Sequence, residues 1–144
     1  MRRGDDGTIT ILVVGFTAIL LLLVAVVVDV SAVVLARRGA ASAADGAAVA
    51  AAQQLDRGVL YAQGLDGAIP LAPDDVQTVV QQYAADSRDG QPGLTLEASL
   101  DETGTTATVV ARRQVRLPFV GWLSVGGTVT VTAVARARAP LVAP

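Results

Sequence analysis

The sequence contains a run of 20 residues, Ile9 to Val28, without a charged side chain. As an α-helix, with a rise of about 1.5 Å per residue, this run extends about 30 Å, which matches the hydrocarbon core of a bilayer. The apolar region of a cleaved signal peptide is shorter, about 7 to 15 residues, and here apolar residues resume directly after Asp29. We therefore expect an uncleaved signal anchor that crosses the membrane once.

Charge alone does not orient this span. Arg2 and Arg3 before it are matched by Arg37 and Arg38 after it, and the positive-inside rule depends on a difference between the two sides. Placing the short segment 1–8 in the cytoplasm is the simpler arrangement. We expect the longer C-terminal part to be extracytoplasmic, held at the cell membrane by a single pass.

The helical pattern continues beyond the span, so that one helix is expected over residues 9–57. This continuation is rich in Ala, the residue with the highest helix propensity. On a helical wheel, polar residues and small residues fall on opposite stripes. The stripe of small residues comprises Ala40, Ala43, Ala47 and Ala51. Because such a face lets two helix backbones approach closely, we expect these alanines to contact a partner helix.

Asp29 is the one charged residue between Ile9 and Ala36. The wheel places it on the small-residue face, which favours a contact with a partner protein. Its position at the outer end of the span allows a second interpretation, in which the carboxylate reaches the headgroups and marks the interface. A mid-membrane charge, which costs a few kcal/mol, would then be avoided.

The C-terminal half predicts a small helix-plus-sheet domain. A Gly- and Pro-rich linker is expected at 58–73, followed by a domain at 74–144. Its helix would begin with a capping box at Asp74 and Gln77 and end near Ser87. Three segments then alternate apolar and polar residues with the period of a strand. They are residues 94–100, 106–117 and 128–138.

A turn at residues 101–105 would join the first two strands, and residues 118–127 form a crossing loop or a short helical turn. Three strands and one covering helix make an antiparallel sheet with one protected face. The fold class is therefore α+β: a long N-terminal transmembrane and Ala-rich helix, followed by a short helix and a three-stranded antiparallel sheet.

These features together resemble one family. The apolar N-terminal helix, the stretch "LARRGAASAADGAAVAAAQQL" and the β-rich tail ending in "TVTVTAVARARA" are similar to the TadE/TadG-like proteins of Flp (Tad) pilus assembly. The most specific part is the pair Arg37 and Arg38 followed by Ala-rich sequence with Asp45. The resemblance implies a pseudopilin-like protein of the bacterial cell envelope with a pilin-like outer domain, serving a tight-adherence secretion system. It implies other pilins or Tad platform proteins as partners and carries no catalytic residues.

The same resemblance bears on processing. A pilin cleaved by prepilin peptidase usually has Gly before the cut and Glu five residues into the mature helix. The candidate glycines are Gly4 and Gly7, and counting five onward reaches Ile9 and Leu12, neither of which is charged. We therefore expect an unprocessed protein that acts as a minor or assembly component.

Enzymatic chemistry finds little support in the composition. The chain has no Cys, no His and no Lys, which excludes thiol chemistry, Cys or His zinc sites and Ser-His or Ser-Lys nucleophiles. The acidic pairs Asp74-Asp75 and Asp101-Glu102 are adjacent in sequence, and a helix cap and a turn explain them. We expect no enzyme, no cofactor, no metal and no small-molecule substrate. A net charge of −2 also gives no footprint for nucleic acid.

The arginines of the strands leave two functions open. Arg112, Arg113 and Arg116, with Arg136 and Arg138 on a neighbouring strand, could contact an anionic partner. They could equally be a solvated sheet edge that discourages aggregation. The first function is a structural or assembly component of an extracellular filament. The alternative is a membrane-tethered module that binds an envelope ligand such as an anionic polymer.

Overall fold

The structure, a computed structural model, describes residues 5–54, 70–87, 91–119 and 127–139. Its elements are α1 (Asp5–Ala52), α3 (Pro73–Ser87), β1 (Leu94–Leu100), β2 (Thr106–Arg116) and β3 (Thr128–Arg138). The α+β fold predicted from the sequence is confirmed. Most of the predicted linker at 58–73 and of the predicted loop at 118–127 lies outside the described residues.

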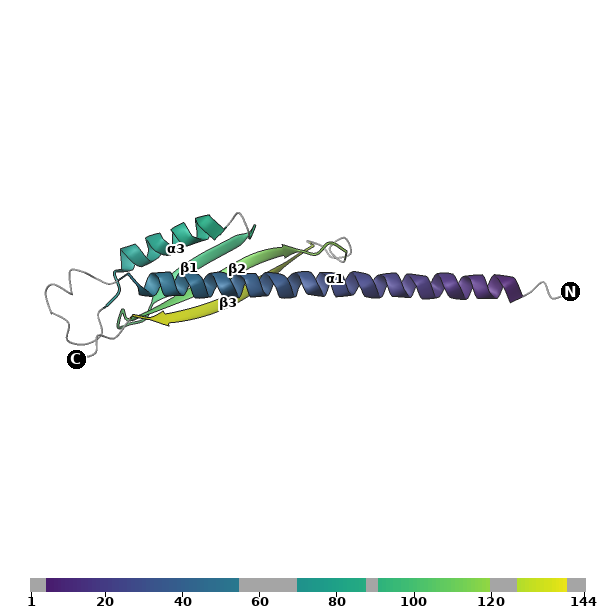
Figure 1. Ribbon diagram of the computed structural model, residues 1–144, viewed down its shortest axis with the longest axis horizontal. Helices are drawn as coiled ribbons and strands as arrows, with labels where there is room; N and C mark the ends of the chain where they lie inside the picture. The colour runs from purple at the N-terminus through teal and green to yellow at the C-terminus, as the bar shows by residue number, and fades with distance from the viewer. Residues whose placement is uncertain (1–4, 55–69, 88–90, 120–126, 140–144) are drawn as a thin grey trace.

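Helix α1 is a rod of 48 residues with a small domain at its C-terminal end (Figure 1). Its N-terminal half projects from the domain, and nearly all side chains between Gly7 and Val28 are exposed. Over its most apolar window the helix has a mean hydropathy of 3.2 with none of the window buried, so it is long and apolar enough to cross a membrane. The C-terminal half, by contrast, is the spine of the domain.

The sheet has the order β1-β2-β3, and both strand pairs are antiparallel. Leu100 faces Ala107 next to the first turn. That turn is closed by the Gly104 N–H, which donates to the Asp101 carbonyl oxygen at 3.0 Å. Gly104 has a φ of +66°, a left-handed conformation that Gly adopts without steric cost. The three strands and the first turn lie where the sequence predicts them.

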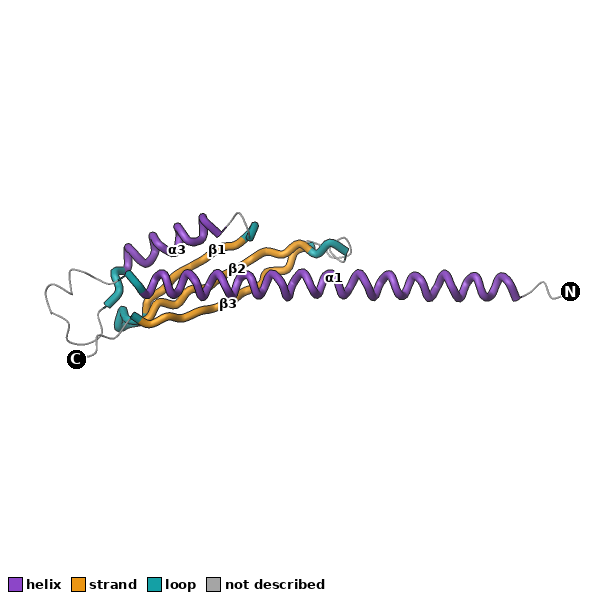
Figure 2. The backbone as a smooth tube through the Cα atoms, in the orientation of Figure 1, coloured by secondary structure: helices purple, strands orange, loops and turns teal. Residues whose placement is uncertain are grey.

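One face of the sheet is covered by helices (Figure 2). The C-terminal half of α1 packs on β2 and β3, and α3 packs on α1 and β1. The inward residues of β2 are mostly small, which lets the helix lie close to the strand. They include Ala107, Val109, Ala111 and Val115. No described helix covers the opposite face of the sheet.

Helix α3 begins at Pro73, one residue before the predicted cap. The Val76 N–H donates to the Ala72 carbonyl oxygen at 3.0 Å, so Ala72 occupies the capping position and Pro73 the first helical position, which suits Pro. Asp74 and Asp75 therefore lie within the first turn, where the helix dipole favours negative charge. The capping box expected at Asp74 was misplaced because Pro73 is itself compatible with the helix start.

Backbone hydrogen bonds join several chain segments at the end of the domain that lies farthest from the projecting N-terminal half of α1 (the free half). Leu71 donates to Gly104 at 2.7 Å, Ala72 to Gln54 at 2.9 Å, and Ala139 to Thr105 at 2.8 Å. Leu71 is buried beneath these contacts. The end of α1, the start of α3 and the first turn of the sheet are thereby held as one unit.

Candidate functional site where the free helix meets the domain

Asp29 lies at the boundary between the two halves of α1. Its side chain is 5% exposed, and Oδ1 accepts a hydrogen bond of 3.1 Å from the Phe119 backbone N–H, 90 residues along the chain. Leu117 lies beside Asp29 over an apolar hollow of α1 formed with Val26 and Val30. The segment after β2 therefore folds back onto α1 at this boundary.

The buried stripe of α1 begins at Asp29. The residues seven and eleven positions further on, Ala36 and Ala40, are also buried, as expected for one face of a helix. The placement of Asp29 on the small-residue face thus agrees with the structure. Its visible contact is with the chain's own backbone, while contact with a separate protein stays a prediction.

The four alanines singled out in the sequence lie on this buried face. Ala40, Ala47 and Ala51 are fully buried and Ala43 is 3% exposed, within the core that α1 forms with the sheet and α3. Their spacing indicates close packing, and the chain's own domain supplies it. Because this fold leaves almost no surface on these side chains, we do not assign them a second protein as partner.

Two glycines in α1 mark close approaches that the sequence did not reveal. A Cβ atom at Gly46 would overlap the Tyr83 hydroxyl and lie 2.8 Å from its Cζ, so the tyrosine of α3 rests on the helix backbone. A Cβ atom at Gly39 would lie 3.0 Å from Gln91 Oε1 and 3.2 Å from Arg113 Nη1. These glycines would have been recognisable only from a tertiary contact.

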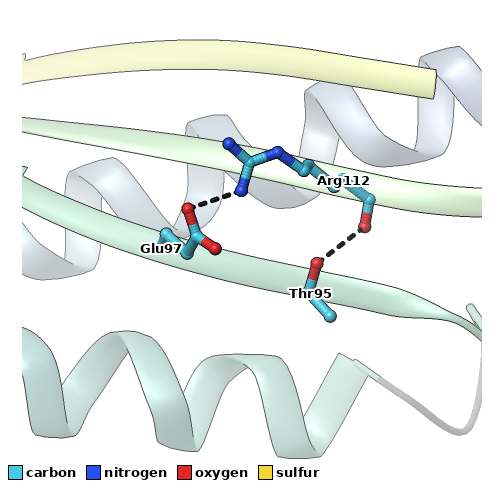
Figure 3. A network of polar contacts seen from close by, with 3 residues as sticks. All are labelled: Thr95, Glu97 and Arg112. Atoms are coloured by element: carbon cyan, nitrogen blue, oxygen red, sulfur yellow. Dashed lines mark hydrogen bonds and ion pairs between the residues drawn. The ribbon is translucent and has the colours of Figure 1, made fainter. Parts of the chain in front are cut away.

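The arginines do not form one cluster. Strand alternation turns Arg112 to the face that no described helix covers, where its Nη1 lies 2.5 Å from Glu97 Oε2, and turns Arg113 to the helix side. The Thr95 hydroxyl donates to the Arg112 carbonyl oxygen at 3.3 Å (Figure 3). Both charged side chains are about half exposed or more, and such pairs contribute about 0 to 1 kcal/mol. The positive charge of Arg112 is therefore already paired with the Glu97 carboxylate.

The remaining arginines separate toward opposite ends of the sheet. Arg136 faces Thr108 and Arg138 faces Thr106, near the first turn, whereas Arg116 faces Thr128 at the other end. There, Arg116 and Arg113 line a groove together with Arg38 of α1. The sequence did not predict that Arg38 and Arg113 line the same groove, although the adjacent pair Arg37 and Arg38 was noted there.

The pKa of Asp101, in the turn between β1 and β2, is displaced from its ordinary value. A hydrogen bond from the Thr103 hydroxyl, and further ones from the Thr106 and Thr105 N–H groups, lower the pKa of Asp101 below its ordinary value. Oδ2 lies 2.7 Å from the Thr103 oxygen and Oδ1 lies 2.8 Å from the Thr105 nitrogen. This arrangement stabilises the turn between β1 and β2. Within the described ranges, no three acidic residues are grouped to hold a metal.

The fold and this junction define a class of protein: a small α+β domain built on the C-terminal half of a helix whose N-terminal half is long and apolar enough to cross a membrane. Residues 7–54 match the family model for putative Flp pilus-assembly TadE/G-like proteins. The match covers both halves of α1, and it confirms the resemblance for this segment. Neither the curated proteins nor the solved structures gave a match. The matched segment and the apolar helix together fit a component of Flp/Tad pilus assembly.

Proposed function

We propose that this protein is a single-pass membrane component of a Flp/Tad-type pilus assembly system, with a structural or assembly role and no catalytic step. The observation that carries the proposal is that the family match at residues 7–54 coincides with α1. This helix is both the apolar rod outside the domain and the spine inside it. A protein built in this way can hold a folded domain directly against the membrane surface.

In the proposed topology, residues 1–8 are cytoplasmic, residues 9–28 cross the bilayer, and the domain is extracytoplasmic. The exposed side chains of the free half support this arrangement, since large apolar residues such as Leu12, Leu20 and Leu22 are each about half to three-quarters exposed. In water such a surface would be costly, at about 25 cal/mol per Å² of apolar area. In a bilayer it faces lipid or the apolar helices of pilins and platform proteins.

Topology can be tested with cysteine labelling, because the chain has no native Cys. Gly7→Cys introduces a thiol with open space around it, and Gln81→Cys introduces one on the exposed face of α3. A membrane-impermeant maleimide added to intact spheroplasts should label Gln81→Cys and should label Gly7→Cys only after permeabilisation. The reverse pattern, or recovery of the protein outside the membrane fraction, would overturn the proposed topology.

The role in assembly requires a genetic test. A strain that lacks the gene should lose surface pili, measured as pilin sheared from cells, and the wild-type gene should restore them. A normal pilus count in its absence would refute the assembly role.

A second candidate is the membrane-tethered envelope-binding module. The face of the sheet that no described helix covers favours it, because Arg112, Arg136 and Arg138 lie there with Glu97, the single carboxylate on the described strands. Under this candidate, Arg112→Gln should weaken sedimentation with an anionic cell-wall polymer. The variant should leave piliation unchanged if the two functions are separate.

We also propose that α1 keeps its N-terminal segment. No carboxylate lies five residues after Gly4 or Gly7, as a processed pilin would require by family resemblance. The intact mass of the protein purified from membranes should include residues 1–8. A mature N-terminus at Asp5 or Thr8 would instead indicate a processed filament subunit.

A further inference from the structure

We propose that the groove lined by Arg38, Arg113 and Arg116 binds the phosphate of an anionic phospholipid headgroup, in the leaflet from which the domain projects. The proposal rests on the membrane anchoring proposed above. It goes beyond that function because it assigns a ligand and a site to residues outside the span.

The hydrogen bond between the Phe119 N–H and Asp29 fixes how far the domain lies from the hydrocarbon core. If residues 9–28 cross the hydrocarbon core, Asp29 lies at its outer limit, and the Phe119 nitrogen is 3.1 Å from Asp29 Oδ1. The headgroup layer extends about 5 to 7 Å beyond the core on each side. The segment that follows β2 is therefore held at the level of the headgroups.

Two of the three arginines, Arg116 and Arg38, lie within reach of that layer. Arg116 precedes Phe119 by three residues, which is at most about 10 Å of extended chain. Arg38 follows Asp29 by nine residues, about 13 Å along the helix axis, but its side chain leans toward the helix N-terminus and so toward the membrane. Long Arg side chains can extend further to bring their charge to the interface.

The lining of the groove suits a phosphate. Its described lining residues include these three arginines and no Asp or Glu, so none of them balances the arginine charge, in contrast to Glu97 beside Arg112. Guanidinium groups bind phosphate oxygens in a bidentate manner. On the α1 side the groove is lined by Ala32 and Leu35, which provide an apolar wall where the glycerol and upper acyl carbons of a lipid would lie.

Gly39 keeps the groove open. Because a Cβ atom there would lie 3.2 Å from Arg113 Nη1, a larger residue would push the guanidinium from its place. This glycine lies one residue after Arg38. Arg38 therefore supplies a positive charge, and Gly39 leaves the space that the Arg113 side chain of β2 occupies.

The test compares two double variants that each remove two exposed positive charges from the full-length protein. Arg38→Gln with Arg116→Gln alters the groove, whereas Arg136→Gln with Arg138→Gln alters the far end of β3. Native mass spectrometry of the detergent-solubilised protein, titrated with phosphatidylglycerol or with phosphatidylcholine of the same acyl chains, gives the affinity for each lipid. The wild type should prefer phosphatidylglycerol. At about fivefold per arginine near a membrane surface, the groove variant should lose about 25-fold in that affinity.

The control variant should bind phosphatidylglycerol as the wild type does, and inorganic phosphate at equal concentration should bind far more weakly than the lipid. Equal losses in the two variants, or no loss in the groove variant, would overturn the proposal. Tight binding of inorganic phosphate alone would also overturn it, since the site would then be a free-anion site. These results leave the proposed function standing if cysteine labelling finds the protein inserted. Recovery outside the membrane would overturn both.

Discussion

The two halves of α1 differ in the size of their apolar side chains and in what covers them. From Gly7 to Val28 the side chains are large, mostly Leu, Val and Ile, and exposed, whereas from Ala36 to Ala52 the inward face consists of alanines that are almost fully buried. In a water-soluble protein the large residues would be inside. Under the topology proposed above, lipid would surround the N-terminal half, whereas the C-terminal half packs closely against the sheet.

This contrast predicts its largest effect for added bulk. Ala47→Leu places a larger side chain where Ala47 is fully buried, and overpacking costs about 1 to 3 kcal/mol. Ala18→Leu adds the same bulk on the exposed half and should leave the domain unchanged. The free energy of unfolding, measured by urea titration in detergent with circular dichroism, would report both. A similar loss in the two variants would erase the distinction between the halves.

A local effect is expected at the boundary. Asp29→Ala removes the acceptor of the Phe119 N–H, and a hydrogen bond to a carboxylate contributes about 1.5 to 3 kcal/mol net. Hydrogen exchange at Phe119, followed by mass spectrometry, should become faster. Ser31→Ala is the matched control, because Ser31 bonds only locally, to the Val27 carbonyl oxygen at 2.7 Å. Unchanged exchange in Asp29→Ala would show that the carboxylate does not hold this segment.

The glycines sharpen the comparison further. Gly46→Ala brings a methyl group against Tyr83, whereas Gly15→Ala meets nothing within 4 Å. Replacing Gly by Ala favours a helix by about 0.5 to 1 kcal/mol, so the two effects partly cancel at Gly46, and a net loss below about 1 kcal/mol is expected there. Urea titration of the domain should show no loss for Gly15→Ala. A stabilised Gly46→Ala domain would mean that Tyr83 moves aside without cost.

We expect low pH to reduce the stability of the domain and to leave the apolar N-terminal half of α1 unchanged. The hydrogen bonds from Thr103, Thr106 and Thr105 lower the pKa of Asp101 in the folded state, so the unfolded chain takes up the proton more readily. This contribution to stability is therefore complete above the ordinary value of 3.8 and is lost as the pH falls through the lowered folded-state value. Urea midpoints measured across this range should decline less steeply in Asp101→Asn. An identical decline would exclude Asp101 as the cause.

Local patterns predicted most of the fold. In β3 the apolar residues that alternate with polar ones include Val131 and Ala135, which are buried, and Val129, which is 39% exposed. The stripe containing Ala47 was recognised as a packing face. Which surface covers that face was not predictable, because an alanine stripe suits a partner helix and an own sheet equally well.

The candidate site depended on contacts distant in sequence, which local patterns do not encode. Asp29 meets Phe119 across 90 residues, and Arg38 meets the groove beside Arg113 only after the sheet has docked on α1. The sequence did mark Asp29 and both arginines as unusual. It could not pair them, because no periodicity connects a helix residue to a residue on a later strand.

The most direct test of the two-halves account is the local environment of two exposed positions on α1. Leu20→Cys and Val49→Cys, in a chain without other cysteines, replace side chains that are 47% and 54% exposed. Spin labels at these positions in reconstituted bilayers can be probed with oxygen, which concentrates in lipid, and with a water-soluble nickel complex. The account predicts a lipid environment at Leu20 and a water environment at Val49. A water-like signal at Leu20, or a lipid-like signal at Val49, would contradict it.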